Sequence, residues 1–180
     1  KRGWTTWLAA GTGDQRIAGI APMIYDNLGL SRQMKHQFAS WDVYSEQIRD
    51  STSTGLLDVL ETPEGQKLEK MMDPIAYLSN IKCPVLMING SNDPYWTVDA
   101  LSLYWDELRM PKAVSIIPNA RHELGDKRQA FDVLAAFAVS TTGAFKFPMV
   151  DMRLSTANGR HIASYAYTGV SMKRNRFLWT

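Results

Sequence analysis

The sequence predicts an α/β fold in which helices flank a parallel sheet. Three short apolar runs, at residues 17–25, 84–89 and 113–117, have the length and composition of buried strands. Stretches with helical periodicity separate these runs, and such alternation is typical of a parallel sheet covered by helices. The chain has 180 residues, of which 45% are hydrophobic, and that is enough apolar mass for a sizeable core.

The first two predicted elements are a helix over residues 3–10 and a strand over 17–25. Trp4, Trp7 and Leu8 recur at the spacing of one helical face, and a Gly-Thr-Gly-Asp stretch then ends the helix. The apolar run IAGIAPMIY follows and stops at an Asp-Asn pair.

Residues 28–80 are more polar, and we interpret them as an inserted helical lobe. The stretch from residue 64 to 72 keeps helical spacing of its apolar residues, while breaks occur at 51–55 and 62–63. This segment is therefore expected to lie outside the sheet.

The second half of the chain repeats the strand–helix pattern. After the strand at 84–89, Thr97 is the expected N-cap of an amphipathic helix. Its predicted apolar face consists of Leu101, Tyr104, Trp105 and Leu108. After the strand at 113–117, Asp126 is the expected cap of the last helix. Its predicted apolar face consists of Phe131, Leu134, Ala135 and Ala138.

Residues 147–180 depart from this alternation and predict the start of a β-rich appendage. An Asn-Gly pair at 158–159 separates two strand-like runs, which is the strongest short-range signal of a β-hairpin. The stretch from 174 to 180 reads as a further strand.

The charge is unevenly distributed along the chain. Residues 1–146 hold 15 Lys and Arg against 17 Asp and Glu, whereas residues 147–180 hold five against one. Without a nucleic-acid-binding motif, we interpret the basic tail as the solvated face of a hairpin and expect no nucleic-acid partner. No apolar run is long enough to span a membrane. The single cysteine, Cys83, excludes an internal disulfide and a Cys-rich zinc site.

Two loops carry residues that suit acid–base chemistry. Asp93 follows the strand at 84–89, and His122 follows the strand at 113–117, 29 residues later. Loops after neighbouring parallel strands meet at one edge of the sheet, so this carboxylate and this imidazole can pair. A carboxylate behind a histidine fixes the imidazole tautomer, which makes the other nitrogen a general base for a serine. In α/β-hydrolases the chain order is Ser, Asp, His, so the serine is expected directly before Lys1.

Several blocks of the sequence together resemble one family. The blocks are KRGWTTWLAA, IAPMIYDNL, PVLMINGSNDPYW, LYWDEL and IIPNARH. They are similar to the PhoPQ-activated pathogenicity-related proteins, a family to which the autocrine proliferation repressor proteins of social amoebae also look similar. The resemblance covers residues 1–146 well and 147–180 loosely. It implies the C-terminal part of an α/β-hydrolase fold in 1–146, with 28–80 as a helical cap, followed by the start of a β-rich domain.

The resemblance also implies roles for individual residues. Asp93 corresponds to the triad acid and His122 to the triad base, and the backbone N–H of Lys1 to an oxyanion-hole donor. No metal or cofactor is implied, and secretion or a periplasmic location is suggested by the family alone. In α/β-hydrolases the nucleophilic serine sits on a sharp turn, the nucleophile elbow, with the common pattern G-x-S-x-G. The turn expected before this first helix departs from that pattern, because Arg2 stands where glycine is usual.

Some assignments stay open at the level of sequence. Asp26 is an alternative acid one strand earlier. Tyr95 and Trp96 either line a substrate pocket or pack their own loop. Arg2 either covers a substrate carboxylate or pairs with a structural acid, and we favour the structural acid.

Two functions are consistent with the sequence. One is a serine hydrolase that acts on an ester or peptide bond of a small-molecule or peptide substrate. The other is a secreted signalling or binding protein on a hydrolase scaffold. Because the expected serine lies outside this sequence, we expect residues 1–180 to be inactive alone. We also expect them to pack against the rest of their own chain or against partner chains.

Overall fold

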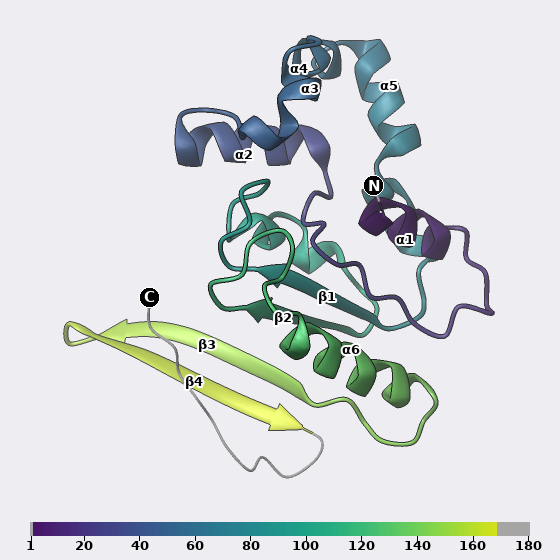
Figure 1. Ribbon diagram of the computed structural model, residues 1–180, viewed down its shortest axis with the longest axis vertical. Coiled ribbons are helices and arrows are strands. Elements are labelled where there is room, and N and C mark those ends of the chain that lie inside the picture. The colour runs from purple at the N-terminus through teal and green to yellow at the C-terminus, as the bar shows by residue number, and fades with distance from the viewer. Residues whose placement is uncertain (1, 169–180) are drawn as a thin grey trace. The chain divides into compact units, whose positions relative to one another are not determined.

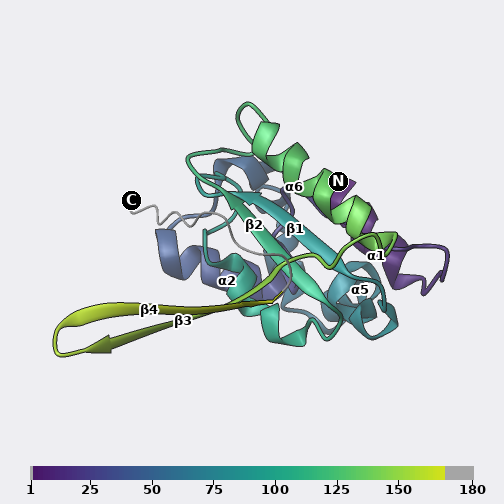
Figure 2. The ribbon, with the colours of Figure 1, turned by 90° about the horizontal axis from the view of Figure 1, so that it is seen from below.

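A computed structural model describes residues 2–168 of the protein, and the chain divides into two compact units, 1–135 and 136–180. The first unit contains two parallel strands, β1 (Val85–Gly90) and β2 (Lys112–Ile117), which run side by side in Figure 2. All six residues of β1 are buried, as expected for a strand covered on both faces. Both strands agree with the apolar runs of the sequence.

The predicted strand at 17–25 is present only as isolated bridges to β1. The amide N–H of Ile20 donates to the carbonyl of Pro84 at 3.0 Å, and that of Ile24 donates to Ile88 at 2.8 Å. Between them stands Pro22, which has no N–H and leaves the ladder incomplete. The segment therefore lies parallel to β1 in register, but the prediction of a regular strand was wrong.

Helix α1 (Arg2–Gly11) confirms the predicted first helix and contributes to the hydrophobic core. It packs against the 3₁₀ segment η2 (Pro74–Asn80), and the Asn80 side chain donates to the carbonyl of Gly11 at 3.0 Å. Trp7 is fully buried. The core around it also contains Ala10, Ile20, Leu28, Leu78, Ile81, Val85, Met87, Tyr104, Leu108 and Met110.

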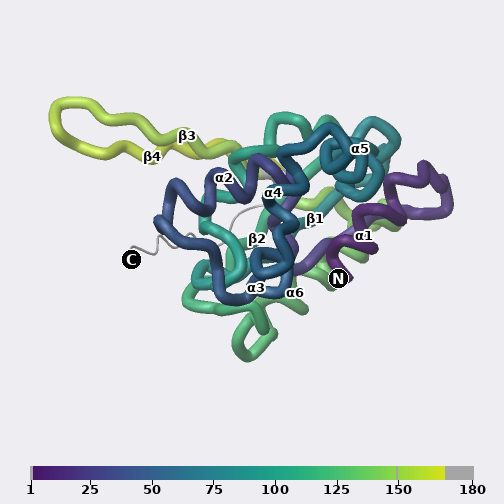
Figure 3. Tube along the Cα trace, turned by 90° about the horizontal axis from the view of Figure 1, so that it is seen from above, coloured from purple at the N-terminus to yellow at the C-terminus, as the bar shows by residue number. Residues whose placement is uncertain are grey.

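The segment predicted to be helical consists of short helices joined by turns. Its elements are α2 (Leu30–Trp41), η1 (Glu46–Ile48), α3 (Arg49–Thr52), α4 (Leu56–Leu60) and α5 (Pro63–Met72). Helices α2 to α5 gather above β1 and β2 in Figure 1, and Figure 3 shows them lying over these strands. The Thr62 side chain caps α5 by accepting the N–H of Gly65 at 3.0 Å.

The helix predicted from Thr97 is replaced by two short 3₁₀ turns, η3 (Ala100–Leu103) and η4 (Trp105–Glu107). Tyr104 interrupts the helical path with a φ of −134°. Its ring is buried and its hydroxyl is bonded to Asp26, so a tertiary contact overrides the helical periodicity. The predicted apolar side was still correct, since Tyr104 and Leu108 are both buried.

The last helix, α6 (Arg128–Thr141), forms as expected, and the Asp126 carboxylate accepts the N–H of Arg128 at 3.1 Å. The apolar face predicted for α6 is shifted by about one residue from the face that is buried. Phe131 is 57% exposed, whereas Ala130 and Phe137 are buried.

The second unit contains an antiparallel hairpin of β3 (Met149–Ala157) and β4 (Arg160–Thr168). Asn158 and Gly159 make the turn with φ values of 52° and 70°, as a type I′ turn requires. The predicted strand at 174–180 lies outside the described residues. No helix within residues 2–168 is long and apolar enough to cross a membrane.

Candidate active site

The candidate site lies at the carboxyl ends of β1 and β2. Gly90 and Ile117 are paired at the last position of the two parallel strands, so the loops that follow begin side by side. The loop after β1 carries Asp93, and the loop after β2 carries His122. This is the edge at which open α/β sheets hold their ligands.

Hydrogen bonds join the two loops directly. The N–H of Ser91 donates to the carbonyl of Ile117 at 3.0 Å, and the N–H of Asn92 donates to that of Ala120 at 2.9 Å. The N–H of Asn119 donates to the Ser91 hydroxyl at 2.8 Å. Because these bonds cross from one loop to the other, the positions of the acid and the histidine are coupled.

Gly90 makes this close approach possible. A methyl group on its Cα would overlap the carbonyl oxygens of Ala120 and Arg121. The glycine at the end of β1 therefore allows the loop that carries His122 to lie against the loop that carries Asp93.

The structure brings Asp93 and His122 together. Nδ1 of His122 lies 2.9 Å from Oδ2 and 3.2 Å from Oδ1 of Asp93. A carboxylate only accepts, so this pairing puts the imidazole hydrogen on Nδ1 and leaves Nε2 free to take a proton. The Asp93 side chain is 8% exposed and that of His122 is 40% exposed, so the acid is shielded while the imidazole is open.

Tyr95 holds both members of the pair. Its backbone N–H donates to Oδ1 of Asp93 at 2.9 Å, and its ring lies 4.1 Å from the imidazole of His122, centroid to centroid. Tyr95 therefore packs its own loop, and it also lines the cavity described below.

The helical lobe fixes the acid loop from the other side. The Gln37 side chain donates to the carbonyl of Tyr95 at 2.7 Å and accepts the N–H of Ser45 at 2.8 Å. The Ser45 hydroxyl donates to the carbonyl of Pro94 at 2.6 Å. Sequence reasoning missed these residues. The sequence carries no signal for Gln37, whose side chain is only 1% exposed in the structure.

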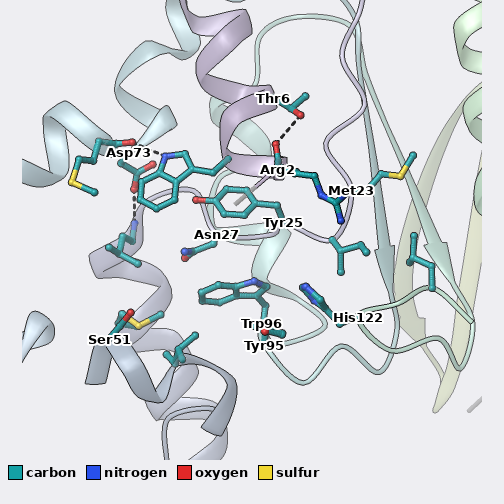
Figure 4. Close-up of a pocket in the computed structure, with 18 of the residues that line it drawn as sticks. Arg2, Thr6, Met23, Tyr25, Asn27, Ser51, Asp73, Tyr95, Trp96 and His122 are labelled. Carbon is teal, nitrogen blue, oxygen red and sulfur yellow. Dashed lines mark hydrogen bonds between the residues drawn. The ribbon is translucent and has the colours of Figure 1, made fainter. Parts of the chain in front are cut away.

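A cavity of about 1180 Å³ opens in front of His122 (Figure 4). Trp96 lines it beside Tyr95, and Arg2 and Tyr25 line it from the other side. The part formed by the helical lobe is mostly aliphatic, with Ser51, Glu69 and Asp73 as its polar residues. The aliphatic residues are Leu30, Met34, Ile48, Leu56, Leu57, Leu60, Leu68 and Met72.

Helix α1 reaches this cavity because Gly3 has no side chain. A methyl group there would overlap Cβ of Tyr25, whose ring stacks on Trp4 at 6.3 Å between centroids. Gly3 thus allows α1 to lie directly against the segment that carries Tyr25. The predicted oxyanion-hole residue, Lys1, lies outside the described residues.

Asp26, the alternative acid, is not the partner of His122. Its carboxylate accepts the Tyr104 hydroxyl at 2.5 Å and the Asn89 side-chain amide at 3.1 Å. Burial raises the pKa of Asp26 to about 6, and the nearby Asp93 carboxylate adds to the rise. Within residues 2–168, no group of three or more His, Cys, Asp or Glu side chains is placed to hold a metal ion.

Comparison of the sequence with known proteins identifies relatives. A sequence model of the family described as PhoPQ-activated pathogenicity-related protein matches residues 1–176. The chain is also 36% identical over 126 residues to autocrine proliferation repressor protein A of Dictyostelium discoideum. That match covers 69% of this chain and 25% of the relative, so the chain spans about a quarter of the relative's length.

Several solved structures have a similar fold. A puromycin-hydrolyzing peptidase of Mycobacterium tuberculosis matches with a TM-score of 0.54 and 21% identity, over 78% of this chain and 20% of that chain. Est1E from Butyrivibrio proteoclasticus matches with a TM-score of 0.51 and 15% identity, over 78% of this chain and 58% of that chain. At these identities the likeness concerns the fold, and it confirms the predicted partial α/β-hydrolase fold.

Proposed function

The chain belongs to the family of PhoPQ-activated pathogenicity-related proteins, and on that basis we propose that it is part of a serine hydrolase. The reaction is the cleavage of an ester or a peptide bond. The observation that carries the proposal is the Asp93–His122 pair, with the imidazole open to a large cavity and the carboxylate shielded behind it.

The proposed mechanism uses a serine that directly precedes Lys1 in the longer protein. His122 Nε2 takes the proton of the serine hydroxyl as its oxygen attacks the substrate carbonyl, while Asp93 stabilises the imidazolium. The imidazolium then gives that proton to the departing alcohol or amine. A water molecule hydrolyses the acyl-serine by the same steps, with His122 again as base and then acid. The backbone N–H of Lys1 is the proposed oxyanion donor.

The cavity is suited to a substrate with a sizeable apolar group. Its aliphatic part, formed by α2 to α5, offers few hydrogen-bonding groups, while Tyr95 and Trp96 line the cavity on the side of His122. We therefore propose a small-molecule or peptide substrate whose apolar side chain or acyl group enters the lobe.

The test is labelling of the full-length protein with a fluorophosphonate, which reacts with activated serines. Labelling is expected for the wild type and should be lost in His122→Ala. His36→Ala is the matched control, because His36 also pairs with a carboxylate, Asp99, at 2.9 Å but does not line the cavity. Absence of labelling, or labelling that survives His122→Ala, would remove the proposal.

A second candidate is a secreted signalling protein on the same scaffold. It is supported by the name of the relative from Dictyostelium discoideum, an autocrine proliferation repressor. The residue before Lys1 separates the two candidates. If that residue is not serine, the hydrolase proposal is wrong and the signalling function is favoured. If it is serine, a His122→Ala protein that still represses proliferation would show that signalling does not need the triad.

A further inference from the structure

Arg2 is a charged side chain of the cavity that the proposed mechanism does not use. It is the first residue of α1, and its guanidinium is turned towards the side of the cavity where His122 lies (Figure 4). In the proposed hydrolase it comes two residues after the nucleophile, so its head group lies near the reacting bond.

Arg2 has no ion-pair partner among residues 2–168. The two carboxylates of the lobe that line the cavity are engaged elsewhere. Asp73 accepts the N–H of Leu30 at 2.6 Å, and Glu69 accepts the N–H and the hydroxyl of Ser31 at 2.7 and 2.6 Å. The structural acid that the sequence favoured as the partner of Arg2 is therefore not found in this part of the chain.

The other charged side chains of the lining offset each other. Lys127 lines it as a second cation without an ion pair in the described range, and Glu123 is the remaining acid of the lining. Arg2 itself is exposed, so a ligand that enters the cavity can reach its guanidinium.

We propose that Arg2 binds a carboxylate of the substrate next to the bond that is cleaved. The guanidinium matches a carboxylate with two parallel N–H donors, which gives both affinity and orientation. This inference rests on the proposed function and narrows its substrate class to esters or amides that carry both an apolar group and a carboxylate.

The test compares two fluorophosphonates of equal length, one ending in a carboxylate and the other in the neutral carboxamide. The full-length wild type should react at least about 10-fold faster with the carboxylate, which corresponds to one charge-assisted contact. Arg2→Gln should bring this ratio close to one, and Arg2→Lys should keep part of it. Arg16→Gln is the control, since Arg16 is exposed and bonded to Asp14 outside the cavity.

The outcomes distinguish the role of Arg2 from the proposed hydrolase activity. Labelling of Arg2→Gln by the neutral probe reports that the site still assembles. Equal rates for both probes in the wild type, or a preference that survives Arg2→Gln, would overturn the role of Arg2 while leaving the hydrolase intact. A preference lost in Lys127→Gln but not in Arg2→Gln would also overturn it. No labelling by either probe removes both proposals.

Discussion

Nδ1 of His122 lies 2.9 Å from Oδ2 of Asp93, and the loops that carry the two residues are hydrogen-bonded to each other. The Asp93 side chain is almost completely shielded from water. A shielded carboxylate holds the imidazole in one tautomer, which is the requirement for general-base catalysis through Nε2.

Replacing Asp93 by asparagine tests this relationship. In Asp93→Asn the side-chain amide can donate to Nδ1, which favours the tautomer whose Nε2 cannot accept a proton. We expect kcat for ester hydrolysis by the full-length protein to fall by about 10⁴-fold, with little change in KM. Asp99→Asn, at the exposed pair with His36, should leave kcat as it is. A fall of less than 10-fold in Asp93→Asn would contradict the assignment.

Gly90→Ala should separate the two loops. The added methyl overlaps two carbonyl oxygens of the His122 loop, so we expect a loss of about 1–3 kcal/mol in the free energy of unfolding and a large drop in kcat. Gly143→Ala is the comparison, because its φ of +81° makes alanine strained although no atom lies within 4 Å. It should cost about 1 kcal/mol without changing kcat. Chemical unfolding and steady-state kinetics of both variants measure the difference.

Asp26 should make stability depend on pH. Its folded pKa of about 6 is above the ordinary value of 3.8, so the folded protein binds this proton more tightly than the unfolded chain does. The stabilisation is present below about pH 4 and is lost as the pH rises through 6. The difference amounts to about 3 kcal/mol for this shift.

Asp26→Asn should remove most of this dependence, because the amide oxygen can still accept the Tyr104 hydroxyl and the side chain carries no charge. Urea unfolding at pH 4.5 and pH 7.5 measures it, with Asp58→Asn on the surface of α4 as the control. If wild type and Asp26→Asn lose the same stability between the two pH values, the buried carboxylate is not responsible.

Leu57→Trp should narrow the aliphatic part of the cavity. Leu57 lines the cavity from α4, so a larger ring there competes with the apolar group of the substrate. We expect kcat/KM for a long-chain acyl ester to fall at least about 10-fold, while that for an acetyl ester changes little. Val59→Trp is matched, because Val59 is an exposed residue of the same helix and does not line the cavity. An equal fall in kcat/KM for both esters would indicate that Leu57→Trp disturbs the fold rather than narrowing the cavity.

Local patterns in the sequence predicted most of the fold. Apolar runs located β1 and β2, and Asn158-Gly159 located the hairpin turn, because these signals depend on neighbouring residues alone. The same reasoning paired Asp93 with His122, since parallel strands place their following loops at one edge.

The errors arose where distant contacts decide the backbone. Pro22 interrupts a ladder that the apolar run alone predicted to be continuous, and Tyr104 leaves the helical path to reach Asp26, 78 residues away. Gln37 could not be assigned to the site, because its partner Tyr95 is 58 residues away and the bond goes to a backbone carbonyl. A backbone acceptor leaves no mark in the sequence.

The two ends of the helical lobe lie next to each other. Leu30 opens α2 and Asp73 follows α5, and a single hydrogen bond of 2.6 Å connects the two. A lobe of another length could join the chain at these two ends, but it would have to keep Gln37 and Ser45, because their hydrogen bonds hold the loop that carries Asp93.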